Sequence, residues 1–211
     1  PENVVPLADR VEMAVVRYLS RNPAKTLYEI EKGIYPQFTG LEAPSKALVL
    51  AVLDSYAQHT DDGRWSLRPS DSPSARHADL DEIRALLTDI GMRLGYETTQ
   101  FNEKTLLWGD QENPAYVFHL IASALAHELF SQKKWPREKS LIILPGGRAG
   151  LLAYKEKRDP ALRSLAEGWR FIKFRLLRSL GEIPLITIET WDEQIGSDPI
   201  EGRSQSQLMM F

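Results

Sequence analysis

The chain of 211 residues contains no cysteine, which excludes disulfide scaffolds and thiolate metal sites. No apolar run approaches the roughly 18 residues that a membrane-spanning helix needs, and no basic segment followed by an apolar one opens the sequence. We therefore expect a cytoplasmic protein without a membrane partner. The first residue is Pro1 rather than an initiator Met, and we expect the chain to be part of a longer polypeptide.

The net charge of the chain is also small. The formal charge is -3 and the isoelectric point is near 5.9, so the chain as a whole gives no signal for nucleic acid. Hydrophobic residues make up 43% and charged residues 26%, which is ordinary for a globular protein with a sizeable core. The length leaves room for one or two domains.

Residues 1–68 contain three helical patterns and one short strand pattern. Apolar residues recur at helical spacing over residues 7–21, a second short helix is predicted over 27–34, and an apolar helix over 46–58. Thr26 and Glu29 have the spacing of a capping box. After the turn at 61–63, residues 64–68 alternate as a strand does. Three helices followed by a short β element predict a winged helix.

Two interpretations of this module remain open. A helix that reads DNA exposes Arg, Lys, Asn or Gln, but the third helix offers little beyond Lys46, and the following strand adds Arg64. Residues 1–80 hold nine Lys and Arg against eleven Asp and Glu. The module therefore either contacts DNA through Lys46 and Arg64 or packs against a partner or a neighbouring domain.

Residues 69–79 are rich in Ser and Pro without periodicity, and we expect a linker. An amphipathic helix follows over 80–94, and three strands then begin near Tyr96, with apolar runs at 105–108 and 115–121. Further patterns predict a helix over 122–132, a central strand over 140–145, mostly helical segments over 151–158 and 160–180, and a strand over 184–188. Gly168 is a possible break in the second helical segment. This order predicts an α/β (α+β) domain with a mixed sheet over residues 80–200, and a C-terminal tail over 201–211.

The run TLLWGDQENPAYVFHL (residues 105–120), placed in this order of elements, resembles the restriction-endonuclease-like (PD-(D/E)xK) fold. The winged helix in front resembles modules that accompany such domains in bacterial restriction and defence proteins and in the tails of DNA methyltransferases. The resemblance covers nearly the whole chain. It implies double-stranded DNA as a partner and a larger DNA-modifying protein as the context.

The resemblance also implies an acid on one strand and an acid-x-lysine on the next, which hold a divalent cation and activate water. The matching positions are Thr105, His119 and Ile121. Isoleucine carries no charge, and one neutral histidine makes a poor Mg²⁺ site. We therefore expect no catalytic residue, no metal and no cofactor, and we interpret His119 and His127 as packing residues. An alternative is a relocated nuclease site built from Glu82, Asp110, Glu128 and Lys133 or Lys134.

Residues 133–178 form a basic block, with thirteen Lys and Arg against four Asp and Glu and interleaved aromatic residues. Such a composition suits phosphate contact with some stacking, and residues 146–150 could present backbone N–H groups to a phosphate at a helix start. The alternatives are a solvated helix face or a surface for an acidic partner. The candidate DNA-binding residues of the block are Arg148, Lys155, Lys157, Arg158, Arg163, Arg170, Lys173 and Arg175.

Three functions follow from the sequence. The first is a non-catalytic DNA-recognition region of a larger DNA-modifying protein. The second is a protein-interaction or dimerisation module that uses the winged helix and the apolar residues 208–211. The third is an active metal-dependent nuclease with relocated acids.

Overall fold

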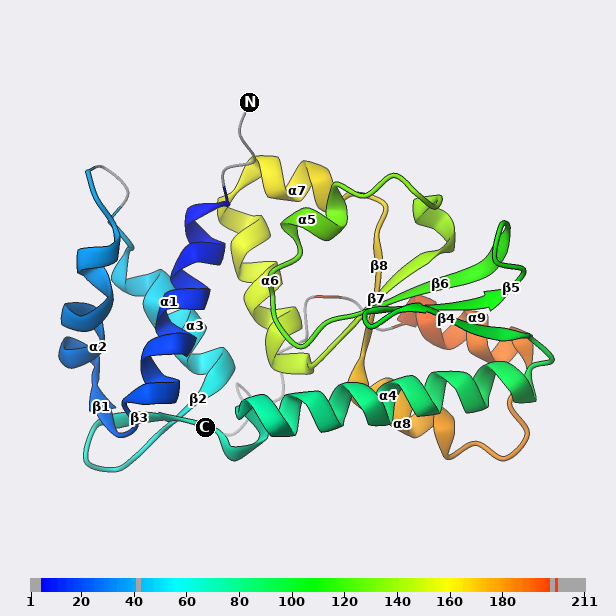
Figure 1. Ribbon diagram of the computed structural model, residues 1–211, viewed down its shortest axis with the longest axis horizontal. Coiled ribbons are helices and arrows are strands. Elements are labelled where there is room, and N and C mark those ends of the chain that lie inside the picture. Colours follow the sequence, from blue (N-terminus) through cyan, green and yellow to red (C-terminus); the bar gives the residue numbers. More distant parts are fainter. Residues whose placement is uncertain (1–4, 41–42, 198–199, 201–211) are drawn as a thin grey trace, which may run out of the picture.

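A computed structural model describes residues 5–40, 43–197 and 200 of the chain (Figure 1). The expected α/β class is confirmed: the described residues form nine α-helices, a three-stranded antiparallel sheet and a five-stranded mixed sheet. None of the described helices combines the length and the apolar character needed to cross a bilayer. The expected tail over 201–211, with its apolar end, lies outside the described residues.

The N-terminal unit follows the sequence patterns closely. Its small sheet has the order β1-β3-β2. Thr26 caps α2 through a capping box, in which Glu29 N–H donates to Thr26 Oγ1 at 3.3 Å and Thr26 N–H donates to Glu29 Oε2 at 2.9 Å. The elements are α1 (Leu7–Arg21), β1 (Lys25–Thr26), α2 (Leu27–Ile34), α3 (Lys46–Tyr56), β2 (Ala57–His59) and β3 (Arg64–Leu67).

The segment expected as a linker is instead folded. A 3-10 turn, η2 (Pro69–Asp71), leads directly into the long helix α4 (Pro73–Arg93). Ser72 is the N-cap, and its hydroxyl accepts a hydrogen bond from Ala75 N–H, while Pro73 occupies the first helical position. Ser and Pro thus act as helix-start signals, where the composition alone indicated a flexible connection.

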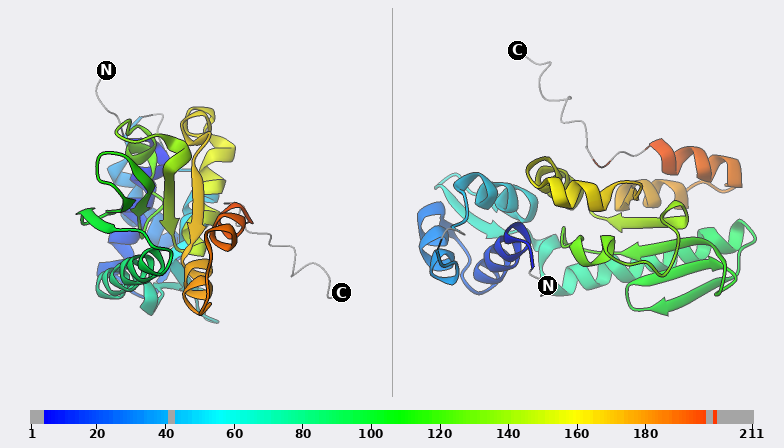
Figure 2. Two further views of the ribbon diagram at one scale, coloured as in Figure 1. Left: turned by 90° about the vertical axis from the view of Figure 1, so that its right-hand side faces the viewer. Right: turned by 90° about the horizontal axis from the view of Figure 1, so that it is seen from above.

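The five-stranded sheet has the order β4-β5-β6-β7-β8, in which the first three strands are antiparallel and the last three parallel. Figure 2 shows the N-terminal unit beside one end of this larger unit. The strands are β4 (Thr98–Asn102), β5 (Thr105–Gly109), β6 (Pro114–Leu120), β7 (Ser140–Leu144) and β8 (Arg170–Lys173). The helices after the meander are α5 (His127–Phe130), α6 (Gly146–Arg158), α7 (Pro160–Ala166), α8 (Phe174–Gly181) and α9 (Ile188–Ser197).

Helices cover both faces of this sheet. Along β7, Leu141 and Ile143 belong to a core with α4, α8 and α9, whereas Ile142 and Leu144 belong to a core with α6 and the N-terminal helices. Successive side chains of a strand point to opposite faces, so a strand covered on both sides is apolar throughout. This burial confirms the central strand expected over 140–145.

Three sequence predictions about this unit were wrong. Residues 122–126 form a loop, and the helix there is only α5. The segment 160–180, expected to be mostly helical with a possible break at Gly168, does break there at φ +81°, but it continues as the strand β8 rather than as helix. Residues 184–188 form no strand, since Thr187 instead caps α9 by accepting a hydrogen bond from Thr190 N–H.

The two units share one hydrophobic core. Buried residues of α1, α2 and α3 pack in the same cluster as residues of α6, α7 and the 122–126 loop. Gly147 at the start of α6 lies so close to α3 that an added Cβ would stand 3.1 Å from the Ser55 carbonyl oxygen. The N-terminal unit is therefore packed onto the larger unit along a seam formed mainly by α1, α3 and α6.

Two buried cations of α6 occupy this seam. Lys155 Nζ donates to Asp9 Oδ1 at 2.6 Å, to Glu12 Oε2 and to the Ala124 carbonyl at 3.0 Å. Glu12 also accepts hydrogen bonds from the Tyr56 hydroxyl and from Ala124 N–H. A buried charge is tolerated only when it is paired and hydrogen-bonded, and here every charged group has partners.

Arg148 makes the second set of contacts. Its guanidinium bonds Asp71, the carbonyl and hydroxyl of Ser55, and the Ala122 carbonyl at 3.1 Å. The same group lies 3.2 Å from the centre of the Tyr56 ring. Lys155 and Arg148 thereby join three segments that are distant in sequence: α1, the end of α3 with η2, and the 122–126 loop.

We predict that Lys155→Met destabilises the protein by ~3–5 kcal/mol, because Asp9 and Glu12 would remain buried without a counter-charge. Chemical denaturation followed by circular dichroism measures this change. Lys157→Met is the matched control, since Lys157 is exposed on the same helix and its replacement should cost no more than about 0.5 kcal/mol. Equal losses for both variants would show that the seam contributes no special stability.

Candidate nucleic-acid interface

Three adjoining depressions form a groove between the N-terminal unit and the open end of β5 and β6. Leu125 lines all three depressions, so the 122–126 loop forms the floor of the groove. The depression nearest the sheet, called the sheet pocket below, has a volume of about 400 Å³. The middle depression lies beside the start of α1, and the far depression lies between α1 and the start of α4.

The sheet pocket lies where the sequence resemblance would place a nuclease site. Thr105 on β5 is the register partner of His119 on β6, and Ile121 follows two residues later on the same face. All three side chains line the pocket. The fold therefore brings the three matched positions together, although none of them provides a carboxylate or a lysine.

His119 combines two environments. Its side chain packs against Trp169, with ring centres 5.6 Å apart, as expected for a packing histidine. It also lines the sheet pocket, is only 3% exposed, and has no hydrogen-bond partner among the described residues. Burial lowers the pKa of His119 from 6.5 to about 4, so the imidazole is neutral at pH 7. A neutral ring offers one N–H donor and one nitrogen acceptor.

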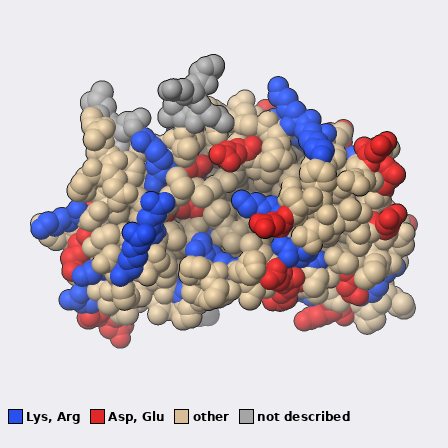
Figure 3. All heavy atoms as spheres, viewed as in Figure 1, with Lys and Arg blue, Asp and Glu red and all other residues tan. Residues whose placement is uncertain are grey.

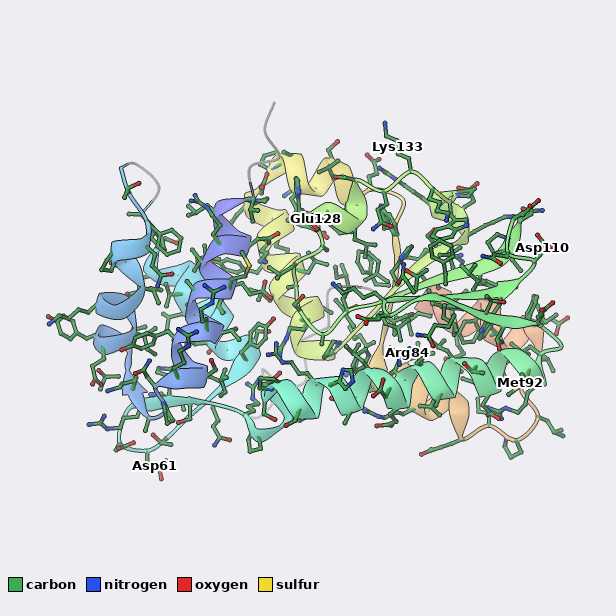
Figure 4. All side chains as sticks on the ribbon, in the orientation of Figure 1. Asp61, Arg84, Met92, Asp110, Glu128 and Lys133 are labelled. Atoms are coloured by element: carbon green, nitrogen blue, oxygen red, sulfur yellow. The ribbon has the colours of Figure 1, made fainter. Side chains whose placement is uncertain are left out.

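The acids of the alternative, relocated site are dispersed. Glu82 on α4 bonds Arg178 of α8 at 2.8 Å. Asp110 lies in the β5–β6 turn, where its carboxylate accepts hydrogen bonds from the N–H groups of Glu112 and Asn113. Figure 4 shows Asp110 at the far end of the β5–β6 hairpin, well away from Glu128 on α5. Within the described part of the chain, no three His, Asp or Glu side chains gather in a metal-binding arrangement.

Three of the candidate DNA-binding residues have buried side chains, which corrects the prediction that they contact DNA. Arg148 is 2% exposed, Lys155 1% and Lys173 3%. A duplex cannot reach these side chains. Lys155 instead pairs with Asp9 and Glu12 of α1, and Arg148 with Asp71 of η2. At the start of α6 the Gly147 carbonyl accepts a hydrogen bond from Ser55 Oγ across the seam, whereas Gly146, Gly147 and Gly150 are exposed. The phosphate contact expected at residues 146–150 stays a prediction.

Several other candidates contact neighbouring protein groups. Arg64 pairs with Asp62 at 3.2 Å and with Glu29 at 3.7 Å. Arg163 donates to the carbonyls of Glu156 and Lys157, and Arg170 donates to the Glu138 carbonyl. The exposed candidates come from four different helices, α3, α6, α7 and α8: Lys46, Lys157, Arg158, Arg163 and Arg175.

The third helix is not available to enter a DNA groove. Helix α3 packs against α1 on one side and α6 on the other. Its exposed residues are Lys46, Ala47 and Asp54. Asp61 and Asp62 at the tip of the β2–β3 turn add negative charge. Of the two interpretations of the N-terminal module, the structure favours packing against a neighbouring unit.

A different set of cations flanks the groove. Arg17 of α1 and Arg76 of α4 line the far depression, and Lys104 lines both the sheet pocket and the middle depression. Lys133 and Lys134 follow α5, and Lys134 lies 3.6 Å from the centre of the Phe101 ring on β4. Figure 3 shows Lys and Arg side chains along α1 and, across the central hollow, over the segment after α5.

The sequence carried one signal for this surface. Arg10, Arg17 and Arg21 recur at intervals of seven and four residues, which places them on one face of α1. That face is the outer one, because Val11, Ala14 and Val15 are buried. Of the remaining cations of the groove, Arg76 is a single basic residue near the start of α4, and Lys104, Lys133 and Lys134 lie in turns and loops, for which no periodic pattern exists.

Comparisons of the chain with protein-family models, with curated proteins and with solved structures gave no match. The candidate interface is therefore defined by geometry and charge: a groove with a polar pocket at one end, a neutral histidine in the pocket, and unburied cations on both sides.

We predict that stability depends on pH through His119. The unfolded chain binds a proton to this residue near pH 6.5 and the folded chain only near pH 4, so stability falls by about 3 kcal/mol as pH falls through this window. His119→Gln should lose this part of the pH dependence in denaturation curves. His77→Gln, which changes an exposed histidine, should keep it. Identical pH profiles for the two variants would contradict the prediction.

Proposed function

We propose that this chain is a DNA-recognition region without nuclease chemistry, combining a winged-helix unit with a degenerate restriction-endonuclease-like domain. In this proposal it belongs to a larger DNA-modifying protein, either a methyltransferase or a restriction or defence protein. The observation that carries the proposal is the groove at the nuclease-like end of the sheet, which has cations on its flanks and no pair of acids at the matched positions.

The order of elements supports the fold assignment. Helix α4, the antiparallel strands β4, β5 and β6, and the parallel strand β7 follow one another as the resemblance implies. In such a fold the catalytic positions on the two central strands share one face. Here Thr105, His119 and Ile121 share that face, and their side chains cannot hold Mg²⁺ together. Binding without cleavage is therefore the activity that fits these residues.

The distribution of charge supports DNA as the partner. Arg17, Arg76, Lys104 and Lys133 have no acidic partner within 4 Å in the described part of the chain. Cations without an acidic partner remain available for phosphates, and each phosphate contact releases counterions. The cations lie on both sides of the groove, as a backbone that crosses it would require.

We predict that the triple variant Arg17→Glu/Lys104→Glu/Lys133→Glu binds duplex DNA at least tenfold more weakly than the parent. The log–log salt dependence should become shallower by about three units, since each lost phosphate contact removes about 0.9. Binding of a labelled duplex at two salt concentrations, with Mg²⁺ present, measures both quantities. The DNA should be intact afterwards.

The matched control is Lys157→Glu/Arg158→Glu/Arg175→Glu, which changes charge by the same amount on α6 and α8. We expect it to retain most of the binding. If the control loses binding and the groove variant keeps it, the DNA-binding surface lies on the basic block (residues 133–178) and not in the groove. Absence of binding by the parent protein at low salt would reject DNA as the partner, and cut DNA would reject the non-catalytic assignment.

A protein-interaction function is the second candidate, and one observation favours it. The apolar third helix already has an internal partner in α6, but Met92, Leu185 and Ile188 are 60%, 88% and 43% exposed. Arg93 bonds the Gly181 and Ile183 carbonyls, which holds the α8–α9 connection against the end of α4. Exposed apolar side chains gathered at one end of a molecule are typical of association surfaces.

We predict that any self-association of the chain is reduced by Leu185→Asp, because this residue is the most exposed of the large apolar side chains in the described part of the chain. Sedimentation velocity over a range of concentrations measures the effect. Tyr28→Asp, at an exposed aromatic residue on α2, is the control. A concentration-independent monomer for the parent protein would remove this candidate.

A further inference from the structure

The sheet pocket has the size and the walls of a small-molecule site. Its volume of about 400 Å³ lies within the range of roughly 300–1,000 Å³ that such sites occupy. One side is apolar and comes from Ile121, Leu125 and Leu129. Apolar side chains of this kind contact the flat faces of a ring, so the pocket suits a planar group.

The polar side of the pocket offers mixed donors and acceptors. The Asn102 and Gln132 amides and the Thr105 hydroxyl each provide both, and so does the neutral ring of His119. Fixed charges of one sign would indicate an anion or a cation as ligand. Alternating donors and acceptors instead match the hydrogen-bonding edge of a nucleobase.

His119 is the most deeply placed titratable group of the pocket. Its side chain is only 3% exposed, but neither ring nitrogen is a fully buried polar atom that lacks a partner. Because the side chain lines the pocket, a ligand there can form a hydrogen bond with the ring. The surrounding strands β5, β6 and β7 hold its backbone rigidly, which fixes the position of the ring.

The charges around the pocket indicate which part of a nucleotide enters. Glu103 and Glu128 line the pocket and are exposed, so they disfavour a phosphate inside it. Lys104 lines both the pocket and the middle depression, where a phosphate is favoured. A nucleotide therefore fits with its base in the pocket and its backbone along the groove.

We propose that the sheet pocket receives a single unpaired nucleobase, whose hydrogen-bonding edge contacts His119 and whose ring lies against Ile121 and Leu129. This inference rests on the proposed function where the base belongs to DNA bound in the groove; a free nucleoside is the other possible source of the same chemistry. His119 is too deeply buried to reach a base that remains stacked in a duplex. The base must therefore leave the stack, which is easiest at a mismatch.

The experiment uses three ligands and the whole chain. A matched duplex and the same duplex with one mismatched 2-aminopurine are titrated by anisotropy and by 2-aminopurine fluorescence, and free nucleosides are titrated by the NMR shift of the His119 ring. We expect the mismatched duplex to bind about tenfold more tightly than the matched one. We also expect the fluorescence to rise as the base leaves the stack.

Variants test the residues of the pocket. In His119→Leu and in Gln132→Ala, the ratio of mismatched to matched affinity should fall toward one. Gln132 is exposed and lies outside the hydrophobic core, so its replacement should not unfold the chain. Gln58→Ala, at an exposed glutamine on β2, is the matched control and should keep the preference.

The outcomes separate this inference from the proposed function. Binding of both duplexes with equal affinity and unchanged fluorescence overturns the nucleobase pocket and leaves DNA recognition in place. Binding of free nucleosides at the His119 ring without binding of any duplex supports the pocket and overturns DNA recognition. If neither duplex nor nucleoside binds, both are overturned.

Discussion

The buried ion pairs of Lys155 with Asp9 and Glu12 determine how the molecule is assembled. Glu12 is held at once by Lys155, by the Tyr56 hydroxyl and by the N–H of Ala124. One carboxylate of α1 thereby fixes α3, α6 and the loop after β6 relative to one another. Removing Lys155 would leave two carboxylates in a low-dielectric interior without a counter-charge, and removing the Tyr56 hydroxyl would cost Glu12 one hydrogen bond, which makes the arrangement cooperative.

The same contacts shape the groove. The loop that Lys155 and Arg148 hold through the Ala124 and Ala122 carbonyls continues into Leu125, which lines all three depressions. Two of the cations that the composition assigned to DNA, Arg148 and Lys155, thus hold the floor of the groove in place. Under the proposed function, the cations that contact phosphates lie instead on the outer face of α1, at the start of α4 and in the turns around the sheet pocket.

In the proposed function, a pocket at the positions matched to a nuclease site and the absence of carboxylates there are compatible in physical terms. A metal site needs carboxylates that remain charged, whereas burial at position 119 favours an uncharged side chain, and the lowered pKa of His119 reflects this environment. A neutral ring in a preformed pocket can still form directional hydrogen bonds. Under the proposal, the pocket would contact a neutral polar group at the place where the resemblance implies a cation.

The sequence by itself determined the local elements: the bounds of α1 and α2, the capping box at Thr26, the central strand β7 and the positions 105, 119 and 121 on one pair of strands. These follow from periodicity and short-range hydrogen bonding. Only the tertiary structure decided the roles of the charges. Lys155 and Lys157 are two residues apart on one helix, yet the first is buried and the second exposed. The difference arises because Lys155 meets carboxylates 146 and 143 residues earlier in the chain, a contact that no local pattern encodes.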